Sequence, residues 1–301
     1  MFSGLKRVLK GLLPQKRKPP QLVMTLLLRD EQDIVRANIE FHLAQGVDFF
    51  IAMDNKSVDS TTEILKEYEQ RGVLHYIYQG DDDYNQSAWV TQMAKLAATE
   101  FDATWVINND ADEFWWPVNQ PTLKEELEAL PADVNMVEGD RYNFVPVEGS
   151  AEQFASKMIY REKVSLNPRG NPLPPKVAHR GIPGITVGQG NHSVWGFKKP
   201  KAVSGVIDIQ HFPLRSYAQF ENKIVKGGQA YERNPGDPKN TGVGWRRLYE
   251  EYKQGNLPAH YKQEEYSPER LKQGLESGEL LVEERLPTLL KGLNIKDNMG
   301  L

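Results

Sequence analysis

Four short apolar runs alternate with helical patterns in the first third of the chain, and this alternation restricts the chain to few folds. The runs cover residues 22–28, 47–53, 73–78 and 104–109. The first run, LVMTLLL, is apolar except for one threonine, as in a strand buried on both faces of a parallel sheet. Strand, helix and strand in succession form right-handed crossovers. We therefore predict an α/β fold with a mostly parallel sheet that is flanked by helices.

The pattern is weaker beyond residue 120. MVEGDRYNFVPV at 136–147 and GVIDIQHF at 205–212 favour strands. Residues 165–200 hold many of the prolines and glycines, which predicts loops that could close over a ligand. The residues after 230 favour helices, including one that begins at SPER, where Ser267 is a typical cap.

The first 18 residues contain six basic and no acidic residues, although the whole chain has a formal net charge of −4. Apolar residues recur there at helical spacing, which is typical of an amphipathic helix at a membrane surface. A basic leader, or a helix packed on its own domain, is the alternative. The remaining chain is acidic, which argues against nucleic-acid binding. We expect a cytoplasmic protein, peripheral at the inner face of the membrane if residues 1–18 bind it.

Three carboxylates follow the fourth apolar run in the stretch INNDADEFWWP: Asp110, Asp112 and Glu113. In α/β sheets, ligands bind outside the carboxyl ends of the strands. Two carboxylates one residue apart can hold a hard divalent cation, which prefers oxygen ligands. A capping role for Asp110 or Asp112 is the alternative. Since the chain has no cysteine, any metal must be held by oxygen or imidazole.

Further polar residues follow the other strands. Asp54 ends the second run, where it can accept a hydrogen bond from the ring N–H of a uracil or can satisfy turn amides. Trp115 and Trp116 follow the acidic residues, and we expect one of them to pack in the core and the other to face a sugar in the cleft.

Together these motifs resemble the bacterial family 2-like glycosyltransferases of the GT-A fold, and more closely the subgroup with the pattern WxxxxDxDEFW. The resemblance covers roughly residues 21–228 and rests on LLLRDEQDIVRANIEF, DNKSVDSTT, DADEF, GNHSV and HFPLRS. Lys56 and Ser60 depart from the pattern, because glycines are common at both positions. The resemblance implies a basic segment at 1–20, a GT-A catalytic domain at 21–228 and a mainly helical extension at 229–301.

The resemblance also implies an activity: transfer of a sugar from a nucleotide-diphosphate donor, expected to be a UDP-sugar, to a glycan or lipid-linked acceptor, with inversion. Arg29, Asp30 and Glu31 would border the base, and Asp54 would hydrogen-bond it. Asp110 and Asp112 would hold Mn²⁺ or Mg²⁺ on the diphosphate.

The second half of the resemblance supplies further candidates. A late histidine would complete the metal site, so His192 or His211 could be a ligand, unless each is an ordinary core or loop histidine. Lys176, Arg180 and Arg215 could clamp the diphosphate, or form ordinary ion pairs. Trp115 is the candidate for an aromatic ring against which a sugar packs.

The catalytic base of an inverting enzyme would be a carboxylate; Glu113, Glu138 and Asp140 are the candidates, and we favour Asp140. Surface charge is the alternative for each of them. A non-catalytic carbohydrate- or nucleotide-binding relative of the same fold is the alternative function. Phosphoryl hydrolases with a DxD nucleophile fit less well, because their motif follows the first strand and the motif here follows the fourth.

Overall fold

The computed structural model describes residues 22–81, 85–149, 154–167, 169–233 and 242–295. The predicted amphipathic segment at 1–18 lies outside these residues. Within the described ranges, no helix is long and apolar enough to cross a membrane.

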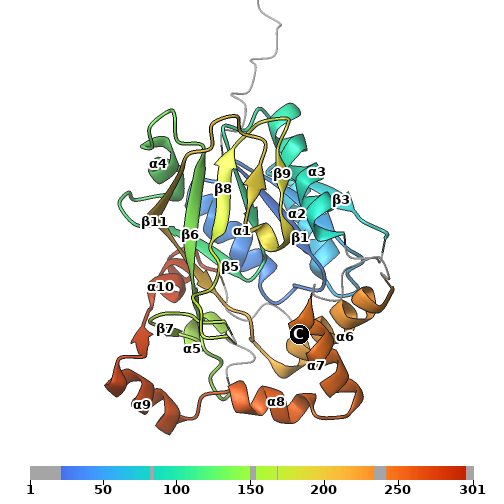
Figure 1. Ribbon diagram of the computed structural model, residues 1–301, viewed down its shortest axis with the longest axis vertical. Coiled ribbons are helices and arrows are strands. Elements are labelled where there is room, and N and C mark those ends of the chain that lie inside the picture. Colours follow the sequence, from blue (N-terminus) through green and yellow to red (C-terminus); the bar gives the residue numbers. More distant parts are fainter. Residues whose placement is uncertain (1–21, 82–84, 150–153, 168, 234–241, 296–301) are drawn as a thin grey trace, which may run out of the picture.

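An eight-stranded sheet forms the centre of the molecule, in the order β3-β2-β1-β4-β8-β6-β11-β5 (Figure 1). Its strands are β1 (Leu22–Leu28), β2 (Phe49–Asp54), β3 (Leu74–Tyr78), β4 (Trp105–Asn109), β5 (Glu113–Pro117), β6 (Met136–Asn143), β8 (Lys176–Arg180) and β11 (Ala202–His211). Strands β8 and β5 run antiparallel to their neighbours, and the other pairings are parallel. The predicted mostly parallel sheet is confirmed, and the four predicted strands match β1 to β4 within two residues at each end.

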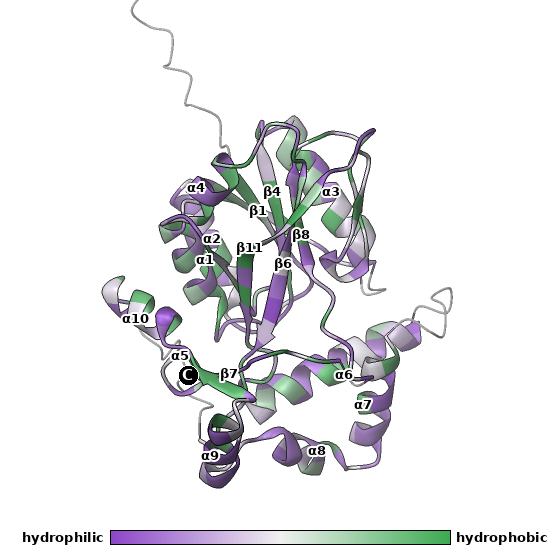
Figure 2. Cartoon of the chain, turned by 60° about the vertical axis from the view of Figure 1, so that its left-hand side comes forward, coloured by the Kyte–Doolittle hydropathy of each residue, from purple (hydrophilic) through white to green (hydrophobic). Residues whose placement is uncertain are grey.

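Helices cover both faces of this sheet. The helices are α1 (Val35–Ala44), α2 (Thr61–Gln70), α3 (Gln86–Thr99), α4 (Leu123–Glu128), α5 (Phe154–Lys157), α6 (Tyr217–Arg233), α7 (Val243–Lys253), α8 (Leu257–Glu264), α9 (Pro268–Ser277) and α10 (Arg285–Gly292). Side chains of β1 alternate between two cores: Met24 and Leu26 face α1 and α2, whereas Val23 faces α3. This alternation explains why the run is apolar except for one threonine, and β1 is largely green in Figure 2.

Strand β5 follows β4 after only three residues, although β8, β6 and β11 lie between them in the sheet. Neighbouring strands are about 4.8 Å apart, so a flat sheet would separate β4 from β5 by ~19 Å. The step from Asn109 to Glu113 spans at most ~14 Å. The sheet must therefore curl, and the curl brings β8, β6 and β11 around the connection Asp110–Asp112.

Residues 165–200 contain more regular structure than predicted. They include β8, which pairs with both β4 and β6, and the short elements β9 (Thr186–Val187), η1 (Gln189–Asn191) and β10 (Val194–Trp195). The loop prediction was wrong at β8, because KVAHR is short and stands between proline-rich and glycine-rich stretches that hide a central strand.

The C-terminal part is mainly helical, as predicted, but it is not a separate appendage. Strand β12 (Leu280–Val282) pairs with β7 (Tyr160–Glu162), and Leu286 and Leu290 of α10 belong to the main core. The expected boundary at 228/229 falls inside α6. Residues 280–292 are therefore part of the body that carries the sheet.

Candidate active site

The acidic loop Asp110–Asp112 lies where β4 ends, beside the ends of β1 and β2, as predicted for a ligand site in an α/β sheet. Asn38 of α1 fixes the loop backbone: its amide donates to the carbonyls of Ala111 at 2.9 Å and Glu113 at 2.8 Å. The positions of the acidic side chains are thus set by a buried helix residue rather than by solvent contacts.

Asp110 is the most accessible acid of the loop, with a side chain that is 38% exposed. One of its oxygens is bound by the ammonium of Lys176, from β8. The other accepts a hydrogen bond from the Asn191 amide at 3.2 Å. The structure therefore brings Lys176 to the DxD motif, as predicted for a residue of the donor site.

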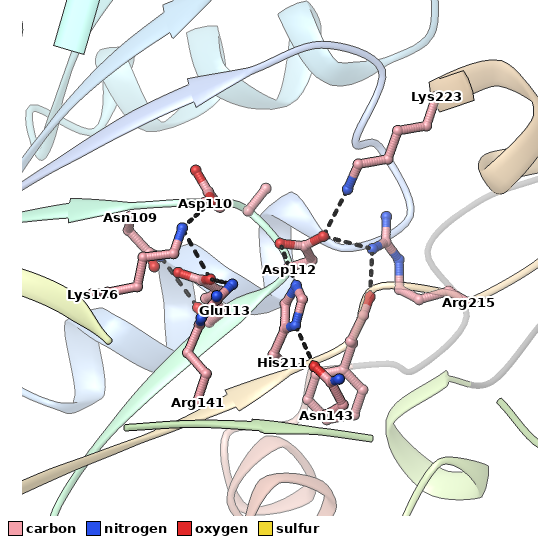
Figure 3. Close-up of polar contacts among 12 residues, drawn as sticks. Asn109, Asp110, Asp112, Glu113, Arg141, Asn143, Lys176, His211, Arg215 and Lys223 are labelled. Carbon is pink, nitrogen blue, oxygen red and sulfur yellow. Dashed lines mark hydrogen bonds and ion pairs between the residues drawn. The ribbon is translucent and has the colours of Figure 1, made fainter. Parts of the chain in front are cut away.

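Asp112 is almost fully buried and surrounded by cations (Figure 3). Its Oδ2 lies 2.8 Å from the Lys223 ammonium and 4.0 Å from the Arg215 guanidinium. Burial opposes ionisation, but the charge of Lys223, together with that of Arg215, outweighs it and holds the pKa of Asp112 below its usual range. Asp112 is therefore a carboxylate at neutral pH.

His211 lies beside Asp112 and is held by Asn143 of β6. The Asn143 amide oxygen only accepts, so Nδ1 of His211 must donate to it, at 2.7 Å. Nε2 is then unprotonated and lies 3.8 Å from Asp112 Oδ1. Burial is the main cause that lowers the pKa of His211, to about 3. His211 thus presents a neutral imidazole nitrogen to a carboxylate oxygen, and both atoms are suitable metal ligands.

Glu113 is completely buried beneath the same cluster. Its Oε1 lies 3.1 Å from Lys176 Nζ and 3.5 Å from an Arg141 nitrogen, but neither carboxylate oxygen has a hydrogen-bond geometry. Burial raises the pKa of Glu113 to about 7 against the lowering effect of Lys176. Glu113 therefore interacts with Lys176 and does not face an acceptor.

The loop after β1 is bound to the region after β11. Arg215, which is 1% exposed, donates to Glu31 at 2.5 Å, to Asp33 at 2.6 Å and to the Phe212 carbonyl at 3.0 Å. Burial raises the pKa of Glu31 to about 7, although Arg215 opposes the rise. Arg29, at the start of this loop, is half-buried.

Asp30 and the turn after β2 are held together by hydrogen bonds. Asp30 accepts from the Val58 N–H at 2.7 Å and is bound by Lys226 of α6. Asp54 is fully buried, and its oxygens accept from the Ser57 N–H, the Thr62 hydroxyl and the Tyr76 hydroxyl. These contacts agree with the alternative that Asp54 stabilises the turn, rather than with a hydrogen bond to a uracil.

Lys56 shares this turn and explains why the resembling proteins prefer glycine there. Its φ is 61°, in the left-handed region that strains residues with a side chain. The turn therefore keeps the geometry that a glycine would give, despite the lysine.

The predicted metal site, made of Asp110, Asp112 and either His192 or His211, is not assembled as a complete set. Among the residues that the structure describes, no group of three or more His, Asp or Glu side chains is placed to hold an ion. His192 is held through its Nδ1, which lies 2.8 Å from the Pro175 carbonyl oxygen. His211 Nε2 lies 3.8 Å from Asp112 Oδ1, so these two side chains converge.

Three predicted site residues, Trp115, Arg180 and Asp140, lie away from the acidic loop. Trp115 is 0% exposed and donates through its indole N–H to Asn109, so it is a core residue and not a sugar-facing wall. Trp116, the other tryptophan, is also buried, against Phe41 of α1. The expectation that one of the two faces the cleft was therefore wrong.

Arg180 and Asp140 are displaced for reasons of strand geometry. Arg180 pairs with Trp105 at the start of β4, so it lies at the opposite edge of the sheet from Asp110. Its guanidinium packs 4.2 Å from the Trp105 ring centroid. Asp140 is exposed and alternates with Arg141, which faces Glu113, so Asp140 points to the reverse face.

Several residues in and around the acidic cluster were not predicted as site residues: Asn38, Arg141, Asn143, Asn191 and Lys223. They are single polar residues within helices or strands, and such residues carry no motif of their own. Arg215 was a candidate clamp for the diphosphate, and the structure places it on Glu31 and Asp33, with Asp112 at 4.0 Å.

An acidic loop whose charge is balanced by cations thus lies at the carboxyl edge of an α/β sheet, beside a neutral histidine. The sequence matches the model of glycosyltransferase family 92 over residues 24–234. The chain belongs to glycosyltransferase family 92. The comparison with curated proteins gave no match.

Solved structures with a similar fold include residues 1–349 of S. aureus TarS, which is 14% identical (83% of this chain and 82% of that chain covered; TM-score 0.42). The same TarS fragment in complex with UDP-GlcNAc is 13% identical (79% and 78% covered; TM-score 0.41). Glucosyl-3-phosphoglycerate synthase from Mycobacterium tuberculosis, in complex with Mn²⁺, UDP and phosphoglyceric acid, is 14% identical (54% and 56% covered; TM-score 0.31). At these identities the similarity concerns the fold alone.

Proposed function

We propose that this chain is a metal-dependent glycosyltransferase that takes a sugar from a nucleoside diphosphate donor, with UDP as the expected nucleotide. A glycan or a lipid-linked sugar is the acceptor class that we propose. Family membership supports the transfer of a sugar. The convergence of Asp112 Oδ1 and His211 Nε2, 3.8 Å apart and without a proton between them, supports the metal dependence.

The protein atoms fit a divalent cation. Mg²⁺ is usually held by one or two carboxylates together with substrate phosphates, so a small set of protein ligands is sufficient. Asp112 and His211 would hold the ion, and the accessible Asp110 is the next carboxylate along the loop. The ion would neutralise the charge that develops on the leaving diphosphate.

The residues around these ligands have distinct tasks in this proposal. Asn143 keeps Nδ1 of His211 protonated and leaves Nε2 free to bind. Lys223 and Arg215 keep Asp112 ionised. The predicted bases Glu113 and Asp140 are not carried into the mechanism, because Glu113 is fully buried and Asp140 lies on the reverse face.

The change Asp112→Asn tests the proposal. UDP with Mn²⁺ should stabilise the wild-type chain, by ~2.7 kcal/mol at a hundred times the dissociation constant. The variant should lose the manganese-dependent part of this stabilisation, measured as the shift in melting temperature. The matched control is Asp133→Asn, an exposed acid that pairs with Lys201. An unchanged shift in Asp112→Asn would remove the metal assignment, and release of UDP from a panel of UDP-sugars would identify the donor.

A further inference from the structure

Each acid of the DxD motif forms an ion pair with a lysine, and the two lysines approach from different sides (Figure 3). Lys176 comes from β8 and lies on Asp110. Lys223 comes from α6, a helix of the C-terminal part, and lies 2.8 Å from Asp112 Oδ2. A divalent cation that binds these carboxylates must therefore compete with two ammonium groups.

The two lysines differ in whether a second carboxylate is close enough to replace the one that a metal would take. Lys176 is 2% exposed and already has a second anion, since Glu113 Oε1 lies 3.1 Å from its Nζ. Lys223 is 32% exposed, and Asp112 is the one carboxylate within ion-pair distance of it among the described residues. If Asp112 binds a metal, Lys176 can stay in place on Glu113, whereas Lys223 needs a new anion.

The proposed donor supplies that anion. A diphosphate bound to an ion on Asp112 must lie next to this carboxylate, and so within reach of the ammonium that the ion displaces. The long flexible stem and compact charge of lysine suit such a change of partner better than a guanidinium would. Because 32% of the Lys223 side chain is exposed, its stem is not packed on every side.

We propose that Lys223 is an exchangeable counter-ion: it neutralises Asp112 in the free enzyme and passes to the donor diphosphate when metal and donor bind. This inference rests on the proposed function. It assigns a substrate-binding residue to α6, outside the region that carries the DxD motif. It also implies that metal and nucleotide bind cooperatively. The metal releases Lys223 from Asp112, and the diphosphate of the nucleotide gives the released ammonium a new partner.

The exchange predicts that Lys223→Ala changes the affinity for Mn²⁺ alone and the affinity for UDP in opposite directions. Mn²⁺ alone should bind several-fold more tightly, because no ammonium competes for Asp112. UDP, at saturating Mn²⁺, should bind ~10-fold or more weakly, because a charge-assisted contact to the diphosphate is lost. Mn²⁺ binding is measured from the electron paramagnetic resonance signal of the free ion, and UDP binding by calorimetry.

The control is Lys253→Ala on α7, which removes the same charge from a lysine that pairs with Glu232 and Glu250. Both affinities should stay at the wild-type values there. If Lys223→Ala does not fold, Lys223→Gln keeps most of the stem and gives the same test. Weaker binding of Mn²⁺ alone, or unchanged binding of Mn²⁺ with weaker UDP, would overturn the exchange. If wild type binds no UDP with Mn²⁺, the proposed function itself fails.

Discussion

The contact between Asn143 and His211 illustrates how one uncharged side chain sets the protonation and orientation of a proposed metal ligand. Without the amide oxygen, His211 can rotate or can carry its proton on Nε2, and either change removes the free nitrogen next to Asp112. The polar partners of metal ligands typically contribute 10–100-fold to metal affinity. The importance of Asn143 is thus comparable with that of a ligand.

We therefore predict that Asn143→Ala raises the Mn²⁺ concentration needed for the UDP-dependent thermal shift by ~10–100-fold. The same titration in a His211→Ala background provides the control. Because Asn143 acts through the imidazole, its removal should have little further effect there. If the double variant needs ~10–100-fold more Mn²⁺ than His211→Ala alone, Asn143 has some other role.

At this scale the sequence predicted the acids better than their partners. Asp110 and Asp112 could be placed because they end an apolar run, and strand ends are where ligands bind. His211 was one of two candidates, and only the fold separates it from His192. Lys223 could not be predicted, because its distance from Asp112 depends on how α6 crosses the end of the sheet.

At the scale of elements, Arg215 joins two segments that each border the acidic loop. It connects the region after β11 to the loop between β1 and α1 through Glu31 and Asp33. Removing one partner of a buried ion pair leaves the other charge uncompensated, which typically costs 3–5 kcal/mol. We expect Arg215 to contribute more to stability than any surface ion pair.

Arg215→Met should accordingly lower the free energy of unfolding by ~3–5 kcal/mol. Arg36→Met is the matched control, because Arg36 binds Glu67 on the surface of α1 and α2 with partial exposure of both side chains. Its loss should cost about 0–1 kcal/mol. Urea denaturation measures both values, and similar losses would argue against a special role for the buried network.

Among the elements, β1 to β4 could be predicted because each is a short apolar run, and the first three are each followed by a helix with a regular period. Strand β8 could not, since its five residues include a lysine, a histidine and an arginine. Its place between β4 and β6 is set by tertiary pairing rather than by its own pattern. The side of the strand on which Asp140 lies was equally hidden, because a register difference of one residue reverses it.

For the whole molecule, α10 is a structural part of the body that carries the sheet. Leu286 of α10 is fully buried in the same core as α1 and β5. Substituting a buried leucine by alanine removes packing and leaves a cavity. Helices α7 and α8 differ from α10, because Tyr249 and Leu257 pack with Phe220 of α6 in a separate cluster. The expected extension is therefore divided between two cores.

We predict that Leu286→Ala lowers the free energy of unfolding by ~2–5 kcal/mol and destabilises the whole chain in one transition. Leu293→Ala, at a position that is 37% exposed, should change it by less than ~0.5 kcal/mol. Thermal unfolding of both variants, followed by calorimetry, provides the measurement. A separate low-temperature transition in Leu286→Ala would instead indicate that α10 unfolds independently.

The short connection between β4 and β5 also has a consequence for synthesis on the ribosome. After β4 has emerged, one of its edges stays without a partner until β8 is made, and β5 has no neighbour until β11 is complete. Throughout the translation of residues 118–211, the nascent chain thus exposes an open strand edge and two tryptophans. Open edges are sites of aggregation. The same curl that gathers the acidic loop and its cations thus delays the completion of the sheet until β11 has been made.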